Sequence, residues 1–271
     1  MKIIVTTDFS DNSIAGLRMA ASLASVLHAE LHFLHVCYFP GKPEEDADTH
    51  KAWIKKEMQE LEERLQSFVK PFLKYFDSKD TVNYHVEESF FVESAILHLQ
   101  RKIKADMICI STRGAGKLPK LLGTTAGNLI TRTTVPVMVV PFNYKMRTLK
   151  TVVHFCDLEN PASEIKQLAA ITEKLNLKTE LVHFAKKAGI SKAEEQMSKQ
   201  VKDSNIRVLI IPMSGSSLSK NMLTYAEKMN PSLVAVFTRE RKTFLQRIFN
   251  SSRSEELAFH TKTPLLVFHK K

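Results

Sequence analysis

The chain has 271 residues, of which 44% are hydrophobic and 25% charged, a composition typical of a soluble globular protein with one large domain or two ordinary ones. No apolar run approaches the roughly 20 residues that span a bilayer, and the N-terminal run is too short for a signal peptide, so we expect a cytoplasmic protein without a membrane partner. The net charge of +10 is uneven, because residues 148–271 carry 20 Lys and Arg against 12 Asp and Glu. These basic residues are scattered and accompany no nucleic-acid motif, so a solvated basic surface is favoured over nucleic-acid binding.

Residues 2–141 alternate apolar, strand-like runs with amphipathic helical segments. The strand-like runs are short and rich in β-branched residues, as strands buried on both faces are. The predicted strands cover residues 2–7, 30–38, 81–87, 107–110 and 135–141. The predicted helices cover residues 14–27, 51–76, 90–103 and 125–133, with Pro71 kinking or ending the second and Phe91 on the apolar face of the third. Residues 40–50 are predicted to form a polar loop.

Strands that alternate with helices predict a parallel sheet with helices on both faces. In such sheets a ligand binds at the carboxyl ends of the strands, where the strand order reverses. The first predicted strand ends at Asp8, and the fourth ends in the loop 111–116. We expect these two ends to face one another across the reversal point. The three cysteines lie in or beside apolar runs without metal-ligand spacing and are predicted to be buried hydrophobic residues.

The stretch 107–125 has the form of a phosphate-binding loop. A buried-looking strand runs into a turn of small residues that includes Arg113, and Gly123 then opens a helix. Glycines let the backbone approach an anion, and the unpaired N–H groups and the dipole at a helix start attract negative charge. Arg113 is interpreted either as a phosphate partner or as a solvated loop residue.

Residues 148–271 repeat the same pattern in weaker form. The run 151–156 ends at Asp157, as the first strand ends at Asp8. Residues 232–239 align with 106–113, and residues 263–268 align with 135–140. The economical interpretation is two tandem domains of one fold, 1–142 and 148–271, joined near residues 143–149.

Together these features make the chain resemble a tandem universal stress protein. The resemblance is carried by Thr-Asp-Phe-Ser after the first strand, Leu-His-Val in the second, the loop after the fourth, and Val-Pro-Val-Met-Val-Val-Pro in the fifth. ATP-binding members carry Gly, two residues, Gly, nine residues, then Gly-Ser or Gly-Thr. Here Ser111 takes the first position and Gly114 the second, and Gly123-Thr124 follow after eight residues. The resemblance implies two flavodoxin-like (adenine nucleotide alpha hydrolase-like) domains, each with a five-stranded parallel sheet.

The resemblance further implies that ATP, with or without magnesium, is a regulatory ligand of the first domain. Asp8 and the backbone around Val36 would hold the adenosine, and the glycine loop would hold ribose and phosphates. The nucleotide-binding residues predicted in this way are Thr7, Asp8, Val36, Ser111, Arg113, Gly114, Gly123, Thr124 and Thr125. Taken alone, Asp8 fits a turn residue equally well. No general base or nucleophile is evident, so at most a weak ATPase is expected.

The second domain is predicted not to bind ATP, because Glu240 stands where Gly114 stood and Asn250-Ser251 replace Gly123-Thr124. The apolar strands 135–141 and 264–268 look like exposed sheet edges, which invite pairing. By resemblance, such edges would join the two halves as an internal pseudo-dimer, and a homodimer of whole chains, which is common in the family, stays open. The alternative function is an interaction scaffold that binds no nucleotide.

Overall fold

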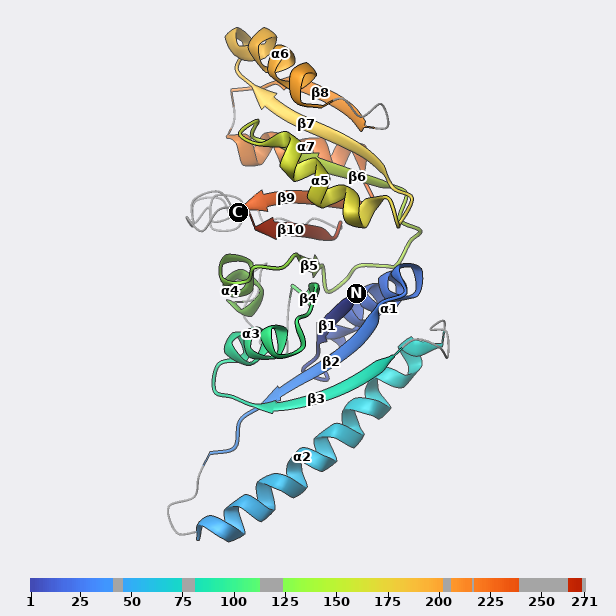
Figure 1. Cartoon of the computed structure of the whole chain (residues 1–271), viewed down its shortest axis with the longest axis vertical. Helices are drawn as coiled ribbons and strands as arrows, with labels where there is room; N and C mark the ends of the chain where they lie inside the picture. The colour runs from blue at the N-terminus through green and yellow to red at the C-terminus, as the bar shows by residue number, and fades with distance from the viewer. Residues whose placement is uncertain are drawn as a thin grey trace.

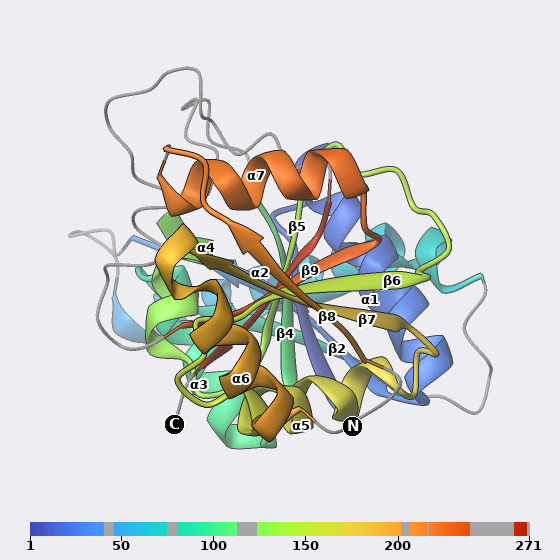
Figure 2. The ribbon, with the colours of Figure 1, turned by 90° about the horizontal axis from the view of Figure 1, so that it is seen from above.

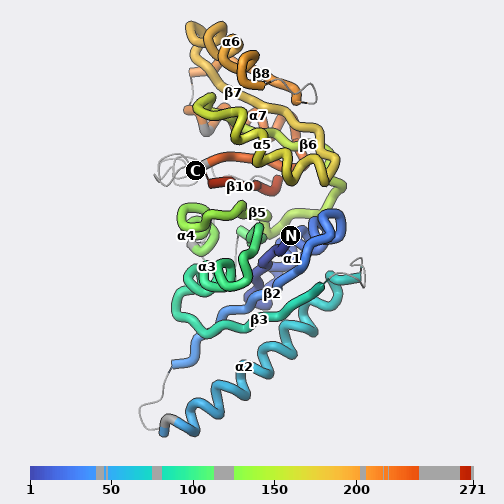
Figure 3. The backbone as a smooth tube through the Cα atoms, in the orientation of Figure 1, coloured from blue at the N-terminus to red at the C-terminus, as the bar shows by residue number. Residues whose placement is uncertain are grey.

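The computed structural model describes residues 1–40, 46–74, 81–112, 124–201, 206–215, 217–238 and 263–269. These residues form an elongated molecule in which one twisted sheet runs along the long axis (Figure 1). The N-terminal half occupies one end of this axis and the C-terminal half the other, as the backbone tube also shows (Figure 3). The fold is therefore an α/β fold, as the alternating pattern of the sequence predicts.

Within the described residues the sheet has ten strands in the order β3-β2-β1-β4-β5-β10-β9-β6-β7-β8. All neighbouring strands are parallel except β5 and β10, which are antiparallel. The strand bounds are β1 Lys2–Thr6, β2 Glu30–Cys37, β3 Val82–Glu88, β4 Met107–Ser111, β5 Val137–Val140, β6 Thr151–Phe155, β7 Lys178–Ala185, β8 Ile206–Pro212, β9 Leu233–Thr238 and β10 Leu265–His269.

Helices cover both faces of the sheet (Figure 2). One face packs against α1, α2 and α5, and the other packs against α3, α4 and α7, while α6 packs against β7 and β8 beside α5. The helix bounds are α1 Ile14–Leu27, α2 Ala47–Val69, α3 Val92–Ile103, α4 Thr124–Arg132, α5 Pro161–Thr172, α6 Ile190–Gln200 and α7 Leu218–Met229, with 3-10 turns η1 Asp11–Ser13, η2 Lys70–Leu73 and η3 Lys187–Gly189. None of the helices described here is both long and apolar enough to cross a membrane.

The two halves meet where β5 pairs with β10, with Met138 opposite Leu266. Both strands are buried, and side chains of both halves share the hydrophobic core on each face of the sheet. The pairing expected for the two apolar edge strands is therefore present within one chain. Removing these edges from solvent protects the backbone groups that an open edge would expose.

Several helix boundaries differ from the sequence prediction. The predicted start of the third helix at residue 90 is wrong, because α3 begins at Val92 and Phe91 is 58% exposed rather than part of the core. Helix α2 begins at Ala47, inside the predicted loop, because the carboxylate of Asp46 accepts the N–H groups of Asp48 and Thr49 and so caps the helix. Pro71 falls in the 3-10 turn η2, which confirms that the long helix breaks late.

Candidate functional site

The carboxyl ends of β1, β2 and β4 lie side by side at the point where the strand order reverses. From β1 the chain adds β2 and β3 on one side, then crosses back to place β4 on the other. Val5 pairs with Cys109 across this point, and the backbone N–H of Thr7 donates to the carbonyl oxygen of Leu34. The residues just after these pairs include four predicted site residues, Thr7, Asp8, Val36 and Ser111, so the sheet gathers them at one edge.

Thr7 is buried and organises the turn that follows β1. Its Oγ1 accepts the N–H of Phe9 at 3.0 Å and lies 2.8 Å from Oγ of Ser13. Because the Ser13 hydroxyl donates to the carbonyl oxygen of Ser10, the Thr7 hydroxyl donates to Ser13. The hydroxyl thereby uses its one donor and one of its two acceptor positions inside the protein, so Thr7 shapes the turn.

Asp8 is the exposed carboxylate of this turn. Its Oδ1 accepts the N–H of Ser10 at 3.1 Å and the Ser10 hydroxyl at 2.6 Å, which is the pattern of an Asx turn. The side chain therefore fulfils the turn role that the sequence also allowed. Its exposure keeps it accessible to a ligand beyond the carboxyl end of β1.

Phe9 is held between β2 and α2. It adopts a left-handed backbone conformation with φ of 60°, and its ring lies 4.2 Å from the ring of His35 and 5.5 Å from that of Phe68. The guanidinium of Arg64 lies 4.4 Å from the centre of the same ring, a cation–π contact. These contacts fix the turn against the last part of helix α2.

His35 links the ends of β1 and β2. Its Nδ1 lies 3.0 Å from the carbonyl oxygen of Thr7 and donates to it. Burial lowers the pKa of His35 below 6.5, and the positive charge of Arg64 lowers it further, against the raising effect of the Thr7 carbonyl and Asp8. The imidazole is therefore neutral at pH 7 and supplies position rather than charge.

Ser111 ends β4 and is buried against helix α1. Its Oγ accepts the backbone N–H of Gly16 at 3.1 Å. A Cβ on Gly16 would lie 3.1 Å from that oxygen and 3.2 Å from the backbone nitrogen of Ser111, so glycine permits this close approach of helix and strand. The hydroxyl at the first position of the glycine motif thus faces α1.

The rest of the predicted loop is described only at its end. Arg113, Gly114 and Gly123 lie outside the described residues. Helix α4 begins at Thr124, followed by the half-buried Thr125, and its first turn contains no acidic residue. The helix therefore starts within one residue of the predicted position. Its first turn has no negatively charged side chain that would repel an anion.

The turn after β6 repeats the main features of the turn after β1. His183 Nδ1 donates to the carbonyl oxygen of Cys156 at 2.8 Å, and Asp157 Oδ1 accepts the N–H of Glu159 at 3.1 Å. Leu158 is left-handed, with φ of 67°. The matched residues of the two halves are Thr7 and Cys156, Asp8 and Asp157, Phe9 and Leu158, Ser10 and Glu159, and His35 and His183. This repetition supports the internal repeat read from the sequence.

A buried cluster of potential metal ligands, which the sequence pattern does not predict, lies in the second half and consists of His154, Cys156 and Glu164. Cys156 was interpreted as a buried hydrophobic residue, and its burial is confirmed. Burial and the negative charge of Glu164 raise the pKa of this thiol, which favours its protonated form. The spacing of His154 and Cys156 was the available signal, because residues i and i+2 of a strand share a face.

Comparison with known proteins identifies one family. The sequence model described as the universal stress protein family matches residues 1–141. A comparison with curated proteins finds no match to the chain. The resemblance inferred from the motifs of the first half is therefore confirmed.

Solved structures share the fold over the full length. A universal stress protein from Archaeoglobus fulgidus DSM 4304 has a TM-score of 0.72 and 17% identity, over 100% of this chain and 98% of its own. A functionally unknown protein from Pseudomonas aeruginosa PAO1 has a TM-score of 0.59 and 15% identity, over 99% and 92%. A universal stress protein in complex with cAMP covers 52% of this chain at 22% identity, but its TM-score of 0.39 is too low to bear on a ligand here.

Proposed function

The chain belongs to the universal stress protein family, and from that premise we propose that it is a cytoplasmic stress-response protein that binds ATP or a related adenine nucleotide through its first half. The proposed role of the nucleotide is regulatory. The nine residues predicted from the sequence form the proposed site, and those that the structure describes lie at the ends of β1, β2 and β4 and at the start of α4. Magnesium accompanies the nucleotide in this proposal.

The observation that carries the proposal is the position of the described predicted residues at the reversal point of the sheet. Thr7, Asp8 and Val36 lie at the ends of β1 and β2, beside the end of β4 at Ser111. The glycine-containing segment leads from there into the N-terminus of α4. Open α/β sheets bind ligands at such points, and helix N-termini suit phosphates.

The second half is proposed to have lost the site while keeping the fold. Asp157 occupies the same turn as Asp8, so the carboxylate alone does not define a nucleotide site. What distinguishes the halves is the segment after the fourth strand, where the sequence replaces two glycines by Glu240 and Asn250. Both side chains occupy space that the glycines leave open, and the carboxylate of Glu240 also repels phosphates. The β5–β10 pairing supports an internal pseudo-dimer of one binding and one non-binding domain.

Matched aspartate variants test the proposed site. Both Asp8→Ala and Asp157→Ala remove a carboxylate that accepts the N–H two residues ahead, and Asp8→Ala also removes the acceptor of the Ser10 hydroxyl. Only Asp8→Ala is expected to weaken ATP binding, by about 10–100-fold, the worth of a hydrogen bond to a charged group. Calorimetric titration of the full chain with ATP and magnesium measures this. Equal effects of the two variants contradict the site, and absence of binding at millimolar ATP contradicts the nucleotide proposal itself.

An interaction scaffold is the second candidate, favoured by one surface feature. Tyr38, Phe90 and Phe91 are 54%, 70% and 58% exposed. The centre of the Phe90 ring lies 5.3 Å from that of Tyr38 and 5.0 Å from that of Phe91. Contiguous exposed aromatic rings are typical of protein-interaction surfaces. The scaffold function is supported if the unaltered chain binds a protein partner but no ATP, and if Phe90→Ser no longer binds that partner.

A further inference from the structure

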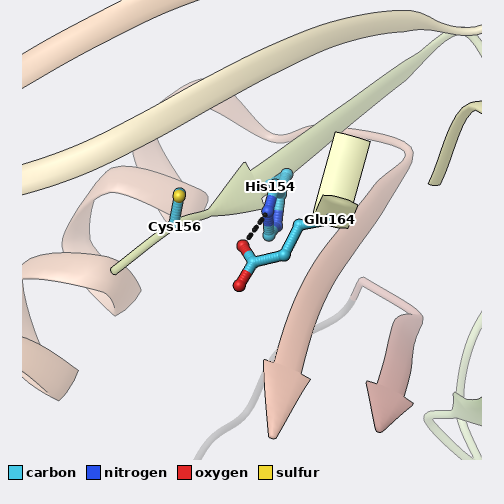
Figure 4. A group of neighbouring side chains, drawn as sticks. All are labelled: His154, Cys156 and Glu164. Carbon is cyan, nitrogen blue, oxygen red and sulfur yellow. Dashed lines mark hydrogen bonds and ion pairs between the residues drawn. The ribbon is translucent and has the colours of Figure 1, made fainter. Parts of the chain in front are cut away.

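A buried cluster in the second half brings together three side chains that ligate metal ions. His154 lies on β6, Cys156 follows the same strand, and Glu164 comes from α5 (Figure 4). His154 Nδ1 or Nε2, Cys156 Sγ and a Glu164 oxygen all lie within 4.8 Å of one another. The side chains of His154 and Glu164 are 0% and 3% exposed. Three ligand types are thus gathered in the protein interior, away from competing solvent.

The imidazole is already oriented as a metal ligand. Nε2 faces Oε2 of Glu164 at 2.9 Å, while Nδ1 lies 3.3 Å from the carbonyl oxygen of Ala235. A metal-binding histidine typically donates its second ring N–H to a carbonyl or carboxylate, which fixes the tautomer that presents the other nitrogen. Ala235 is placed for that supporting role, and Nε2 then points at the carboxylate of Glu164.

The first half shows that the fold does not require these side chains. The equivalent sheet position is occupied by Val5, since Lys2 and Thr151 begin matched strands, and Val5 is fully buried. The start of α1 carries Ala15 and Gly16 where α5 carries Glu164. A buried His–Glu pair costs desolvation that these small or apolar residues avoid. A bound cation would offset that cost in the second half.

We propose that His154, Cys156 and Glu164 form a binding site for a zinc-class divalent cation in the second half of the chain. Thiolate, imidazole and carboxylate are the ligands that Zn²⁺ takes, and the thiolate disfavours Mg²⁺ and Ca²⁺. Bonds of about 2.0–2.3 Å place tetrahedral ligand atoms roughly 4 Å apart or less, so the cluster closes on the ion with shifts of about 1 Å. Water or the second Glu164 oxygen completes four-coordination. The bound cation would stabilise the second half, and its binding would not require the nucleotide.

Two buried cysteines provide a matched test. The untagged full chain is stripped of metal, dialysed against limiting Zn²⁺ without nucleotide, and analysed by inductively coupled plasma mass spectrometry. The expected result is one zinc per chain in the unaltered protein and in Cys109→Ala. Cys109 is the control because its thiol lies in the first half, where it contacts the carbonyl oxygen of Gly16. In Cys156→Ala the affinity falls by more than about 100-fold, since even outer-shell partners are worth 10–100-fold.

Cobalt substitution adds a readout that a merely structural role of the cysteine does not move. Co²⁺ bound in the unaltered protein and in Cys109→Ala should show thiolate-to-metal charge-transfer absorption, and Cys156→Ala should lack it. Glu164→Gln keeps the size of the side chain while removing the anionic ligand, and should also weaken zinc. Folding of each variant is verified by circular dichroism. If the stripped protein takes up no zinc, or if Cys156→Ala and Cys109→Ala retain it equally, the site is refuted and the cluster is a buried polar pair.

Discussion

At the scale of single residues, Ser111 has a structural role that the motif comparison alone does not reveal. It aligns with the first glycine of the family motif, so it places a side chain where the motif has none. The structure places its hydroxyl oxygen 3.1 Å from the N–H of Gly16, inside the core. The departure from glycine is therefore coupled to the packing of α1 on β4.

The histidine pair between β2 and β3 makes stability depend on pH. His32 Nδ1 lies 3.0 Å from His85 Nε2, and burial together with the charges of His32 and Lys102 lowers the pKa of His85 to about 4. Burial also lowers the pKa of His32, although the charge of Glu30 opposes this and that of Lys2 adds to it. In the unfolded chain both titrate near 6.5.

Because the folded protein binds fewer protons than the unfolded chain between pH 4 and 6.5, the free energy of unfolding should rise with pH across this range and level off above it. Urea unfolding at several pH values measures the slope. His85→Gln should flatten it, because one of the two titrating groups is gone. A slope that is unchanged in His85→Gln would show that the pair does not govern acid sensitivity.

At the scale of elements, the sequence predicts which segments form helices and strands better than where they end. Apolar periodicity places the strands of both halves because these are buried on both faces. Helix starts depend on local caps, and the Asp46 cap moves α2 into the predicted loop. The candidate site is predictable to the extent that the sheet order gathers Thr7, Asp8 and Ser111. The cluster of His154, Cys156 and Glu164 is not predictable from the sequence, because it forms only when α5 packs on β6.

The contact between α1 and β4 depends on a missing side chain. Gly16→Ala should gain about 1 kcal/mol of helix propensity but lose about 1–3 kcal/mol to overpacking, a net loss measurable by denaturant unfolding. The added Cβ meets the backbone nitrogen of Ser111 at 3.2 Å, which cannot move freely. Gly215→Ala is the control, because nothing lies within 4 Å of its Cβ. Equal stabilities of the two variants would contradict the close packing.

At the scale of the whole molecule, the antiparallel pairing of β5 and β10 turns two five-stranded sheets into one. In the full chain Met138 and Leu266 are fully buried at this junction. The alternating βα pattern predicts each half, and the apolar composition of the fifth strands predicts that they pair. The pattern does not predict whether the two strands pair within one chain or between chains, and the structure shows the pairing within one chain.

A fragment of residues 1–142 should self-associate, because it exposes the apolar edge of β5 that β10 covers in the full chain. Sedimentation velocity should show that the purified fragment forms dimers or larger species. At the same molar concentration the full chain should sediment as one species with fewer copies of the chain. Addition of residues 148–271 should convert them into a one-to-one complex. A fragment that stays monomeric and does not bind the second half would show that the junction contributes little to stability.

The central claim, one adenine-nucleotide site in the first half, is tested most directly by the binding stoichiometry of the full chain. Calorimetric titration with ATP and magnesium should give one equivalent per chain. Gly123→Val should abolish binding because a side chain then blocks the approach of the backbone to phosphate, whereas Asn250→Val, at the matched position of the second half, should leave it unchanged. Two equivalents per chain, none, or full binding by Gly123→Val would contradict the account.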